Sequence, residues 1–177
     1  MKIKRITTIS ILAALLCVLS PISIPIGAIP ISLSTFVIYV IAAILSPLDT
    51  VFVILLYIAL GAIGIPVFSS YRSGIGTLFG LTGGYIFGFL ALALIMGAMI
   101  KAKPDNIPWA FFSMAVGLFA CYAFGSAWFY FFYAANGEVK SVWGILLSCV
   151  IPYLLPDAAK AALSQLIVRR CGKYIKK

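Results

Sequence analysis

The chain is a succession of long apolar segments separated by short polar or proline-rich connections. Leu, Ile, Val and Ala fill these segments, and the ten-residue alternating pattern of membrane β-strands does not occur. Continuous apolar runs of this kind predict a bundle of helices rather than a barrel. Six such segments can be marked, at residues 6–24, 33–45, 50–64, 78–100, 108–133 and 142–168.

The second and third segments are shorter than the roughly 20 residues that a helix needs to cross a bilayer core of about 30 Å. They are joined by Ser46, Pro47, Leu48 and Asp49. Proline and aspartate favour turns, and Asp49 is a candidate cap for the helix that follows. We interpret the pair as a hairpin of two short or tilted helices. The alternative is one long kinked helix, which gives five spans and places the termini on opposite sides.

Composition supports a membrane location for the bundle. Hydrophobic residues make up 64% and charged residues 10% of the 177 residues. A soluble domain has about 45–50% apolar and about 25% charged residues. This chain therefore cannot hide its apolar surface in one water-soluble core. We predict an all-α integral membrane protein with six transmembrane helices, in which residues 1–177 form a single transmembrane domain.

The cations lie in short clusters between the apolar segments, so the net charge of +9 indicates membrane topology rather than nucleic-acid binding. With six spans, both termini share one side with the two connections at residues 46–49 and 101–106. That side collects ten of the thirteen cations. By the positive-inside rule, both termini are expected in the cytoplasm and the protein in the cytoplasmic membrane. The opposite connections contain Arg72 and Lys140.

Several classes of chemistry have few candidate residues. The chain has no histidine, which removes histidine metal sites and Ser-His-Asp triads. Its four cysteines, Cys17, Cys121, Cys149 and Cys171, have no metal-ligand spacing and are expected to serve as small packing residues. A phosphate-binding G-x-x-x-x-G-K-[ST] motif is absent from the sequence. We therefore expect no catalytic residues, no metal and no cofactor.

Two connections on the expected outer side are irregular but apolar. Residues 20–32 contain prolines at 21, 25 and 30, and residues 67–89 read VFSSYRSGIGTLFGLTGGYIFGF. Proline favours extended backbone, and glycines such as Gly74 and Gly76 permit tight turns. Non-helical backbone at membrane depth is tolerated where it is buried in protein or lines a cavity. We predict that both connections cap a ligand pocket; the alternative is a pair of ordinary loops.

The last apolar segment carries an acid and a base, Asp157 and Lys160, on one helix face. Ionisable groups inside a membrane are costly and usually face a cavity or each other. One interpretation is a structural ion pair. The other is a ligand site in which Asp157 accepts hydrogen bonds from ligand N–H groups and Lys160 donates to a ligand carbonyl.

Two further residues extend this candidate site. Arg72, the arginine of the outer side, has a planar fork that suits a ligand carboxylate, and Tyr85 offers a hydroxyl beside Gly83 and Gly84. The alternatives are a solvated charge and an interfacial aromatic residue. Together these residues suit a small anionic molecule with a polar ring. Aromatic residues are candidates for the pocket walls, among them Phe36, Phe68, Tyr71 and Trp143.

Four stretches of the sequence carry a family resemblance. They are IPIGAIPISLSTFVIYVIAAILSP, YIALGAIGIPVFSS, GTLFGLTGGYIFGF and PYLLPDAAKAAL, and together they extend over most of residues 24–163. In this order they resemble the biotin-specific S-components of the BioY family. The chain departs from the usual family pattern at Ser34, at Ser70-Tyr71 and at Leu81.

The resemblance implies a six-helix subunit of an energy-coupling factor (ECF) transporter that binds biotin on the outer side. It implies a membrane T-component and two ATPase subunits as partners, and biotin as transported ligand. Asp157 and Lys160 match the motif associated with the biotin head group, and Tyr85 matches the tyrosine of a Gly-Gly-Tyr motif. Arg72 lies in a loop that varies within the family.

Other functions remain as alternatives at this point. Within transport, the ligand is biotin or another small anionic vitamin. A membrane enzyme would have to rely on one intramembrane acid–base pair. A structural or assembly protein of the membrane would not need the irregular apolar connections, nor Asp157 and Lys160.

Overall fold

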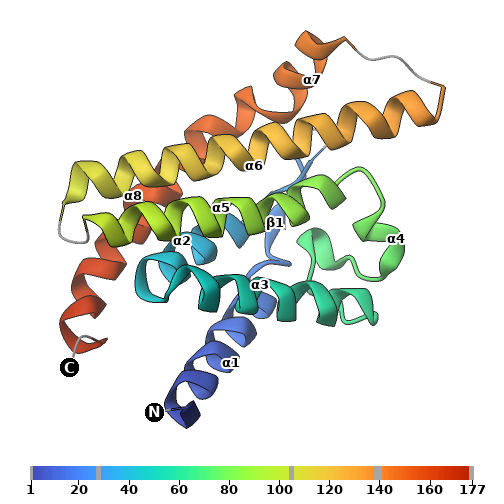
Figure 1. Cartoon of the computed structure of the whole chain (residues 1–177). Coiled ribbons are helices and arrows are strands. Elements are labelled where there is room, and N and C mark those ends of the chain that lie inside the picture. Colours follow the sequence, from blue (N-terminus) through green and yellow to red (C-terminus); the bar gives the residue numbers. More distant parts are fainter. Residues whose placement is uncertain (1, 27–28, 104–105, 138–140, 176–177) are drawn as a thin grey trace.

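The structure is a bundle of helices with one small β-hairpin (Figure 1). This computed structural model describes residues 2–26, 29–103, 106–137 and 141–175. In chain order its elements are α1 (Lys2–Leu19), β1 (Ser23–Ile24), β2 (Ile31–Ser32), α2 (Ser34–Ile44), α3 (Pro47–Ala62), a 3-10 turn η1 (Ser69–Tyr71), α4 (Ile75–Leu78), α5 (Gly83–Ala102), α6 (Ile107–Ala135), α7 (Val142–Cys149) and α8 (Ile151–Ile175). The predicted all-α class is confirmed.

Membrane-length helices are concentrated in the second half of the chain. Among the described residues, three helical stretches are long and apolar enough to cross a membrane, namely Gly83–Ala102, Ile107–Ala135 and Val142–Arg170. The helices α2 and α3 are apolar but shorter, with 11 and 16 residues. Short second and third helices are what the sequence predicted. The number of spans, six, stays a prediction.

Two separate helices, α2 and α3, occupy the second and third segments. Leu45 and Ser46 between them are extended, with ψ of 171° and 153°. The single kinked helix is therefore not what the chain forms. Asp49 is not the cap: the side chain of Ser46 accepts a hydrogen bond from the backbone N–H of Asp49 at 3.1 Å. The Asp49 carboxylate instead accepts from Arg5 of α1, whose Nε lies 2.8 Å from Oδ1.

Three predicted helix boundaries are wrong. The first helix ends at Leu19 because proline at position 21 favours extended backbone. The fourth span begins at Gly83, after the separate turn α4. The sixth is divided at Val150, whose φ of −124° and ψ of −57° lie outside the helical range. Pro152 follows this break, in the first turn of α8, where a missing N–H is tolerated.

Helices α5 and α6 pack along each other, and α5 also contacts α2 and α3 (Figure 1). Glycine makes this approach possible at two points. A Cβ atom on Gly84 would lie 2.2 Å from the Cβ of Trp128, and one on Gly125 would lie 2.4 Å from ring atoms of Tyr85. No side chain fits at these distances, so the predicted close approach at Gly84 is present.

The two irregular connections contact each other at one end of the bundle. In the first, β1 and β2 pair antiparallel, with Ser23 opposite Ser32. The second contains η1 and α4. The backbone N–H of Ser70 lies 2.9 Å from the Ser23 hydroxyl and 3.2 Å from the carbonyl of Pro21. Phe68 anchors the second connection, since it is buried and packs edge-on against Tyr57 of α3.

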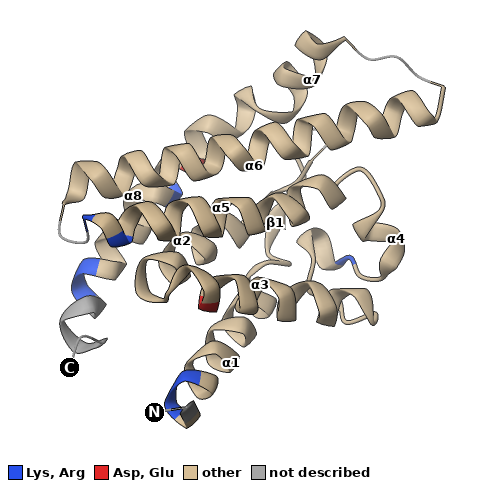
Figure 2. Cartoon of the chain, viewed as in Figure 1, with Lys and Arg blue, Asp and Glu red and all other residues tan. Residues whose placement is uncertain are grey.

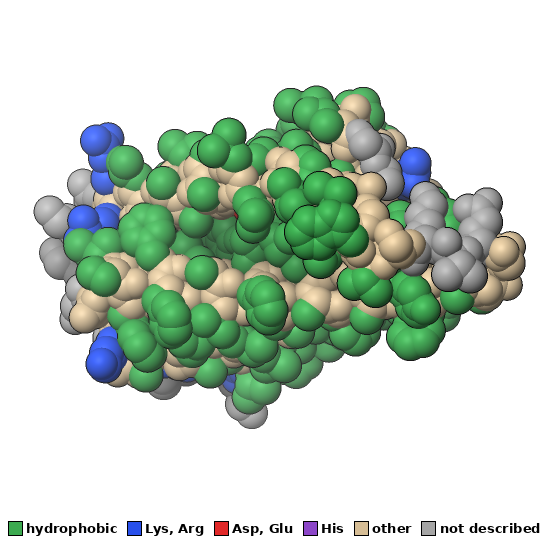
Figure 3. Space-filling model, turned by 90° about the horizontal axis from the view of Figure 1, so that it is seen from above, with side chains coloured by type: hydrophobic (Ala, Val, Ile, Leu, Met, Phe, Trp, Pro, Cys, Tyr) green, Lys and Arg blue, Asp and Glu red, His purple; other side chains and the backbone are tan. Residues whose placement is uncertain are grey.

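Charge separates the two ends of the molecule. The start of α1, the end of α8, the turn between α2 and α3 and the end of α5 lie at one end, on the left of Figure 1. Figure 2 shows that most Lys and Arg residues gather at that end, whereas α4 lies at the opposite end. Figure 3 shows a face made largely of hydrophobic side chains and hollowed near its middle. An apolar surface of this kind suits lipid, and the chain is a multi-pass membrane protein.

Candidate functional site

A pocket lies between the helices and the two irregular connections. The space between its walls, together with the open solvent at its mouth, measures about 720 Å³. Apolar atoms make up most of its wall surface, although many of its lining residues also carry a hydroxyl or charged group. Its lining residues are Ile29, Pro30, Ile31, Ser32, Thr35, Phe68, Ser69, Arg72, Thr77, Thr82, Tyr85, Ile86, Phe89, Leu118, Cys121, Tyr122, Cys149, Tyr153, Asp157 and Lys160.

Asp157 and Lys160 form a buried ion pair in this wall. They stand three residues apart on α8, and Lys160 Nζ lies 2.8 Å from Asp157 Oδ1. Their side chains are 5% and 11% exposed, respectively. Helical geometry places residues i and i+3 on one face, which is why the sequence spacing predicted their proximity. The structure adds that this face of α8 borders the pocket.

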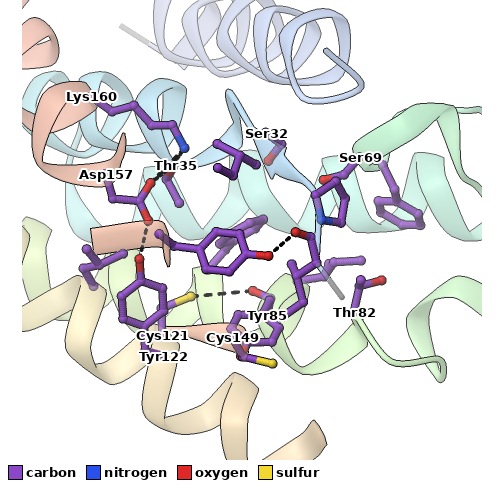
Figure 4. Close-up of a pocket in the computed structure, with 18 of the residues that line it drawn as sticks. Ser32, Thr35, Ser69, Thr82, Tyr85, Cys121, Tyr122, Cys149, Asp157 and Lys160 are labelled. Atoms are coloured by element: carbon purple, nitrogen blue, oxygen red, sulfur yellow. Dashed lines mark hydrogen bonds and ion pairs between the residues drawn. The ribbon is translucent and has the colours of Figure 1, made fainter. Parts of the chain in front are cut away.

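Two hydroxyl groups complete the surroundings of the Asp157 carboxylate (Figure 4). Thr35, in the first turn of α2, donates to Oδ1 at 3.0 Å, and Tyr122 of α6 donates to Oδ2. Lys160 also reaches Thr35, with 3.2 Å between Nζ and Oγ1. Three helices therefore hold one carboxylate. Neither residue was predicted from the sequence, because a single Thr or Tyr in an apolar helix does not indicate a binding site.

This cluster retains capacity for a ligand. A carboxylate has about four acceptor positions, and three are used by Thr35, Tyr122 and Lys160. An ammonium group has three N–H donors, of which two reach Asp157 and Thr35. The pair can thus accept one hydrogen bond from a ligand N–H and donate one to a ligand carbonyl. A small ring with adjacent N–H and C=O groups matches that combination.

Tyr85 lines the pocket, and its hydroxyl lies near side chains of two neighbouring helices. The hydroxyl lies 3.4 Å from the Oγ of Ser126 on α6, and Ser126 is not a lining residue. The ring packs against Gly125. The hydroxyl also meets the side chain of Cys149 of α7, itself a lining residue, so it lies where α5, α6 and α7 come together beside the pocket.

Arg72 lines the pocket from the second irregular connection. It follows η1 directly and is exposed. In Figure 4, Ser69 of the same turn and Thr82 lie away from the Asp157–Lys160 end of the pocket. Backbone pairing between Phe68 and Arg72, with 3.0 Å between N and O, fixes the short loop. Arg72 thus reaches the pocket wall from an exposed loop, and among the described residues no ion pair joins it to Asp157.

The predicted aromatic walls are present in part. Phe68 lines the pocket, together with Phe89 and Tyr153, which the sequence did not single out. Phe36, Tyr71 and Trp143 are not lining residues. The ring of Tyr71 is 68% exposed and that of Trp143 is 67% exposed. Side chains on irregular backbone and near helix ends cannot be assigned to a cavity from their spacing.

The departures from the usual family pattern lie outside the pocket wall. Ser34, Ser70, Tyr71 and Leu81 are not among the lining residues. Ser34 is fully buried and bonds to the hydroxyl of Ser20 at 2.5 Å. The Ser20 hydroxyl in turn lies 2.7 Å from that of Tyr57. The Ser20 hydroxyl, just after α1, therefore links Ser34 of α2 to Tyr57 of α3, and Ser34 does not shape the ligand surface directly.

Metal chemistry finds no support among the residues that the structure describes. No group of three or more His, Cys, Asp or Glu side chains there is placed to hold a metal ion. Cys121 and Cys149 are buried and line the pocket, and the Sγ of Cys121 lies 3.8 Å from the carbonyl oxygen of Tyr85. The side chain of Cys171 lies outside the described part.

Comparison with known proteins identifies the family. The model of the BioY family matches residues 1–177. Biotin transporter BioY2 of Lactococcus lactis subsp. cremoris (strain MG1363) is 38% identical over 92% of this chain and 86% of its own length. Biotin transporter BioY of Thermotoga maritima is 30% identical over 96% of each chain.

A solved structure agrees with this assignment. The crystal structure of the S-component for biotin from an ECF-type ABC transporter superposes with a TM-score of 0.86. The two proteins share 26% identity, and the match includes 97% of this chain and 92% of the other. The resemblance found in the sequence is confirmed: this chain belongs to the BioY family.

Proposed function

We propose that this chain binds biotin as the S-component of an ECF transporter and takes part in its uptake across the cytoplasmic membrane. The observation that carries the proposal is the buried Asp157–Lys160 pair in the wall of an otherwise apolar pocket. Biotin has a ring with adjacent N–H and C=O groups, an apolar body and a carboxylate. As a member of the BioY family, the chain is a transport subunit and not an enzyme.

The pocket offers a partner for each part of biotin. Asp157 accepts from a ureido N–H, and Lys160 donates to the ureido carbonyl. Phe68 and Phe89 pack against the apolar body, and the ring of Tyr85 extends this wall. Arg72 at the mouth binds the carboxylate, which stays close to water. A buried ion pair that also meets ligand polar groups avoids an uncompensated charge.

Energy for transport has to come from other subunits, because the sequence carries no phosphate-binding loop. A membrane T-component and two ATPases are therefore the partners of this proposal. The basic end of the bundle is cytoplasmic, with both termini, and the end that contains α4 faces outward. Residues 1–177 act as one substrate-binding domain in which the two irregular connections cap the ligand.

Equilibrium binding of labelled biotin to the detergent-purified protein tests the proposal. We expect saturable binding that unlabelled biotin displaces and that excess pantothenate or nicotinate does not. The control is a thermal unfolding curve of the same preparation, which establishes that the protein is folded. Folded protein without saturable biotin binding contradicts the proposal. Displacement by another vitamin acid at equal concentration points to a different substrate.

A further inference from the structure

The hydroxyl of Tyr153 connects α8 to the first irregular connection. Tyr153 is 6% exposed and lines the pocket. Its hydroxyl lies 2.8 Å from the carbonyl oxygen of Ile26 and also donates to that of Ile29. Two backbone carbonyls that are far from α8 in sequence thus share one side-chain donor. A buried donor of this kind is costly to leave without a partner.

The carbonyls belong to the stretch of chain that forms one wall of the pocket. Ile29, Pro30, Ile31 and Ser32 all line it. The backbone here has little regular structure, since β1 and β2 have two residues each. Its other hydrogen bonds run within the connection, such as Leu33 N to Ile22 O at 3.2 Å, or to Ser70 of the second connection. Tyr153 therefore ties this wall to the helix on the far side of the pocket.

The same helix face carries the polar pair. Tyr153, Asp157 and Lys160 stand at positions i, i+4 and i+7 of α8, which one face of a helix brings together. The helix begins at Ile151, directly after the break at Val150. Two successive turns of α8 thus make both contacts: Tyr153 meets the wall, and Asp157 meets the ligand. A displacement of these turns disturbs both contacts.

We propose that Tyr153 is a positioning residue that holds the wall at residues 29–32 against α8 and so controls how long a ligand stays in the pocket. The inference rests on the proposed biotin-binding function. The Tyr153 hydroxyl need not touch the ligand. When the bonds to the Ile26 and Ile29 carbonyls break, the wall separates from α8 and the ligand leaves. When they form, the wall closes the apolar part of the pocket.

The variant Tyr153→Phe tests this, because it removes one oxygen atom and keeps the ring. We expect the dissociation rate of labelled biotin, measured by chase with unlabelled biotin, to rise about two- to tenfold, which is the change that loss of one ordinary hydrogen bond gives. The association rate should stay the same or rise. Tyr39→Phe is the matched control. The Tyr39 hydroxyl is buried and has no hydrogen-bond partner among the described residues, so its loss should leave both rates unchanged.

Hydrogen exchange separates positioning from a general loss of stability. In Tyr153→Phe, the amides of Ile31, Ser32 and Leu33 should exchange faster, while those of α5 and α6 stay as in the wild type. In the wild-type protein, biotin should slow exchange at the same three amides, a result that does not depend on any variant. An unchanged dissociation rate in the folded variant overturns the inference. The inference is also overturned if biotin leaves hydrogen exchange at these three amides of the wild-type protein unchanged. Wild-type protein that does not bind biotin overturns the proposed function instead.

Discussion

At the scale of single residues, the Asp157–Lys160 pair is the strongest point of the site. We predict that Asp157→Asn and Lys160→Ala each weaken biotin binding by more than tenfold, a loss of at least about 1.4 kcal/mol. Asn at position 157 places an N–H donor where the ligand N–H needs an acceptor. Ala at position 160 removes the ammonium group that donates to the ligand carbonyl. Isothermal titration with biotin measures the effect.

Asp49→Asn is the matched control for the acid, because it makes the same chemical change in an ion pair with Arg5 at the basic end of the bundle. This control should bind biotin as the wild type does. Breaking a buried pair also destabilises a protein, by about 3–5 kcal/mol, so each variant needs an unfolding curve. Wild-type affinity in both site variants would show that the pair has a structural role alone.

Arg72 has a role that can be tested with a change in the ligand. We predict that Arg72→Ala weakens binding of biotin about tenfold or more and leaves binding of biotin amide nearly unchanged. The reason is that a charge-assisted hydrogen bond contributes about 1.5–3 kcal/mol, and the amide lacks the negative charge. Competition binding with the two ligands measures the contrast. An equal loss for both would place Arg72 outside carboxylate recognition.

Tyr71 illustrates a residue whose backbone conformation suits glycine. Its φ is 59°, in the left-handed region, and its ring is 68% exposed. This conformation costs a non-glycine residue roughly 1–2 kcal/mol. We predict that Tyr71→Gly stabilises the protein by about 1 kcal/mol in detergent unfolding experiments. Tyr71→Ala, which removes the ring but keeps the Cβ atom, should bring no such gain; an equal gain would assign the effect to the ring.

At the scale of elements, the apolar segments predicted the helices because burial in lipid leaves the backbone few alternatives. The turn between α2 and α3 followed from Pro47, and the irregular connections from proline and glycine. Helix ends were less predictable, since Val150 breaks the sixth segment without a proline or glycine of its own. Local spacing does not record such tertiary effects.

The candidate site was predictable where its residues share one helix, as Asp157 and Lys160 do. Thr35 and Tyr122 come to the carboxylate from two other helices, and no periodicity within one segment reports such a meeting. For the same reason, the direction of the Tyr85 hydroxyl depends on the position of α6. Family membership locates the pocket in the chain but not these contacts.

The interface between α5 and α6 allows a test at this scale. We predict that Gly125→Ala destabilises the protein by about 1–3 kcal/mol, because the added methyl overlaps the ring of Tyr85. Displacing this ring, which lines the pocket, should also weaken biotin binding. Thermal unfolding and binding titrations measure the two effects. Gly76→Ala is the control, since a Cβ atom there meets nothing within 4 Å. Unchanged unfolding of Gly125→Ala would mean that the helices separate easily.

At the scale of the whole molecule, charge and ligand access have to agree. In the proposed arrangement the pocket opens toward Arg72, which lines it together with residues of both irregular connections, and most Lys and Arg residues lie at the other end of the bundle (Figure 2). Basic residues remain in the cytoplasm during insertion. An orientation with the basic end inside therefore presents the pocket mouth to the outside, where an uptake protein has to capture its ligand. The positive-inside rule and the proposed uptake of biotin therefore predict the same orientation.

Labelling of single cysteines in intact cells tests this orientation. In a variant in which Cys17, Cys121, Cys149 and Cys171 are replaced by serine, we introduce Tyr71→Cys or Lys103→Cys, both at exposed positions. A membrane-impermeant maleimide should label Tyr71→Cys in intact cells and Lys103→Cys after the membrane is permeabilised. Neither Tyr71 nor Lys103 lines the pocket, so biotin should leave the labelling rate at both positions unchanged. The reverse pattern would place the pocket mouth in the cytoplasm, and an uptake role would then require the ligand to enter from the opposite end of the bundle.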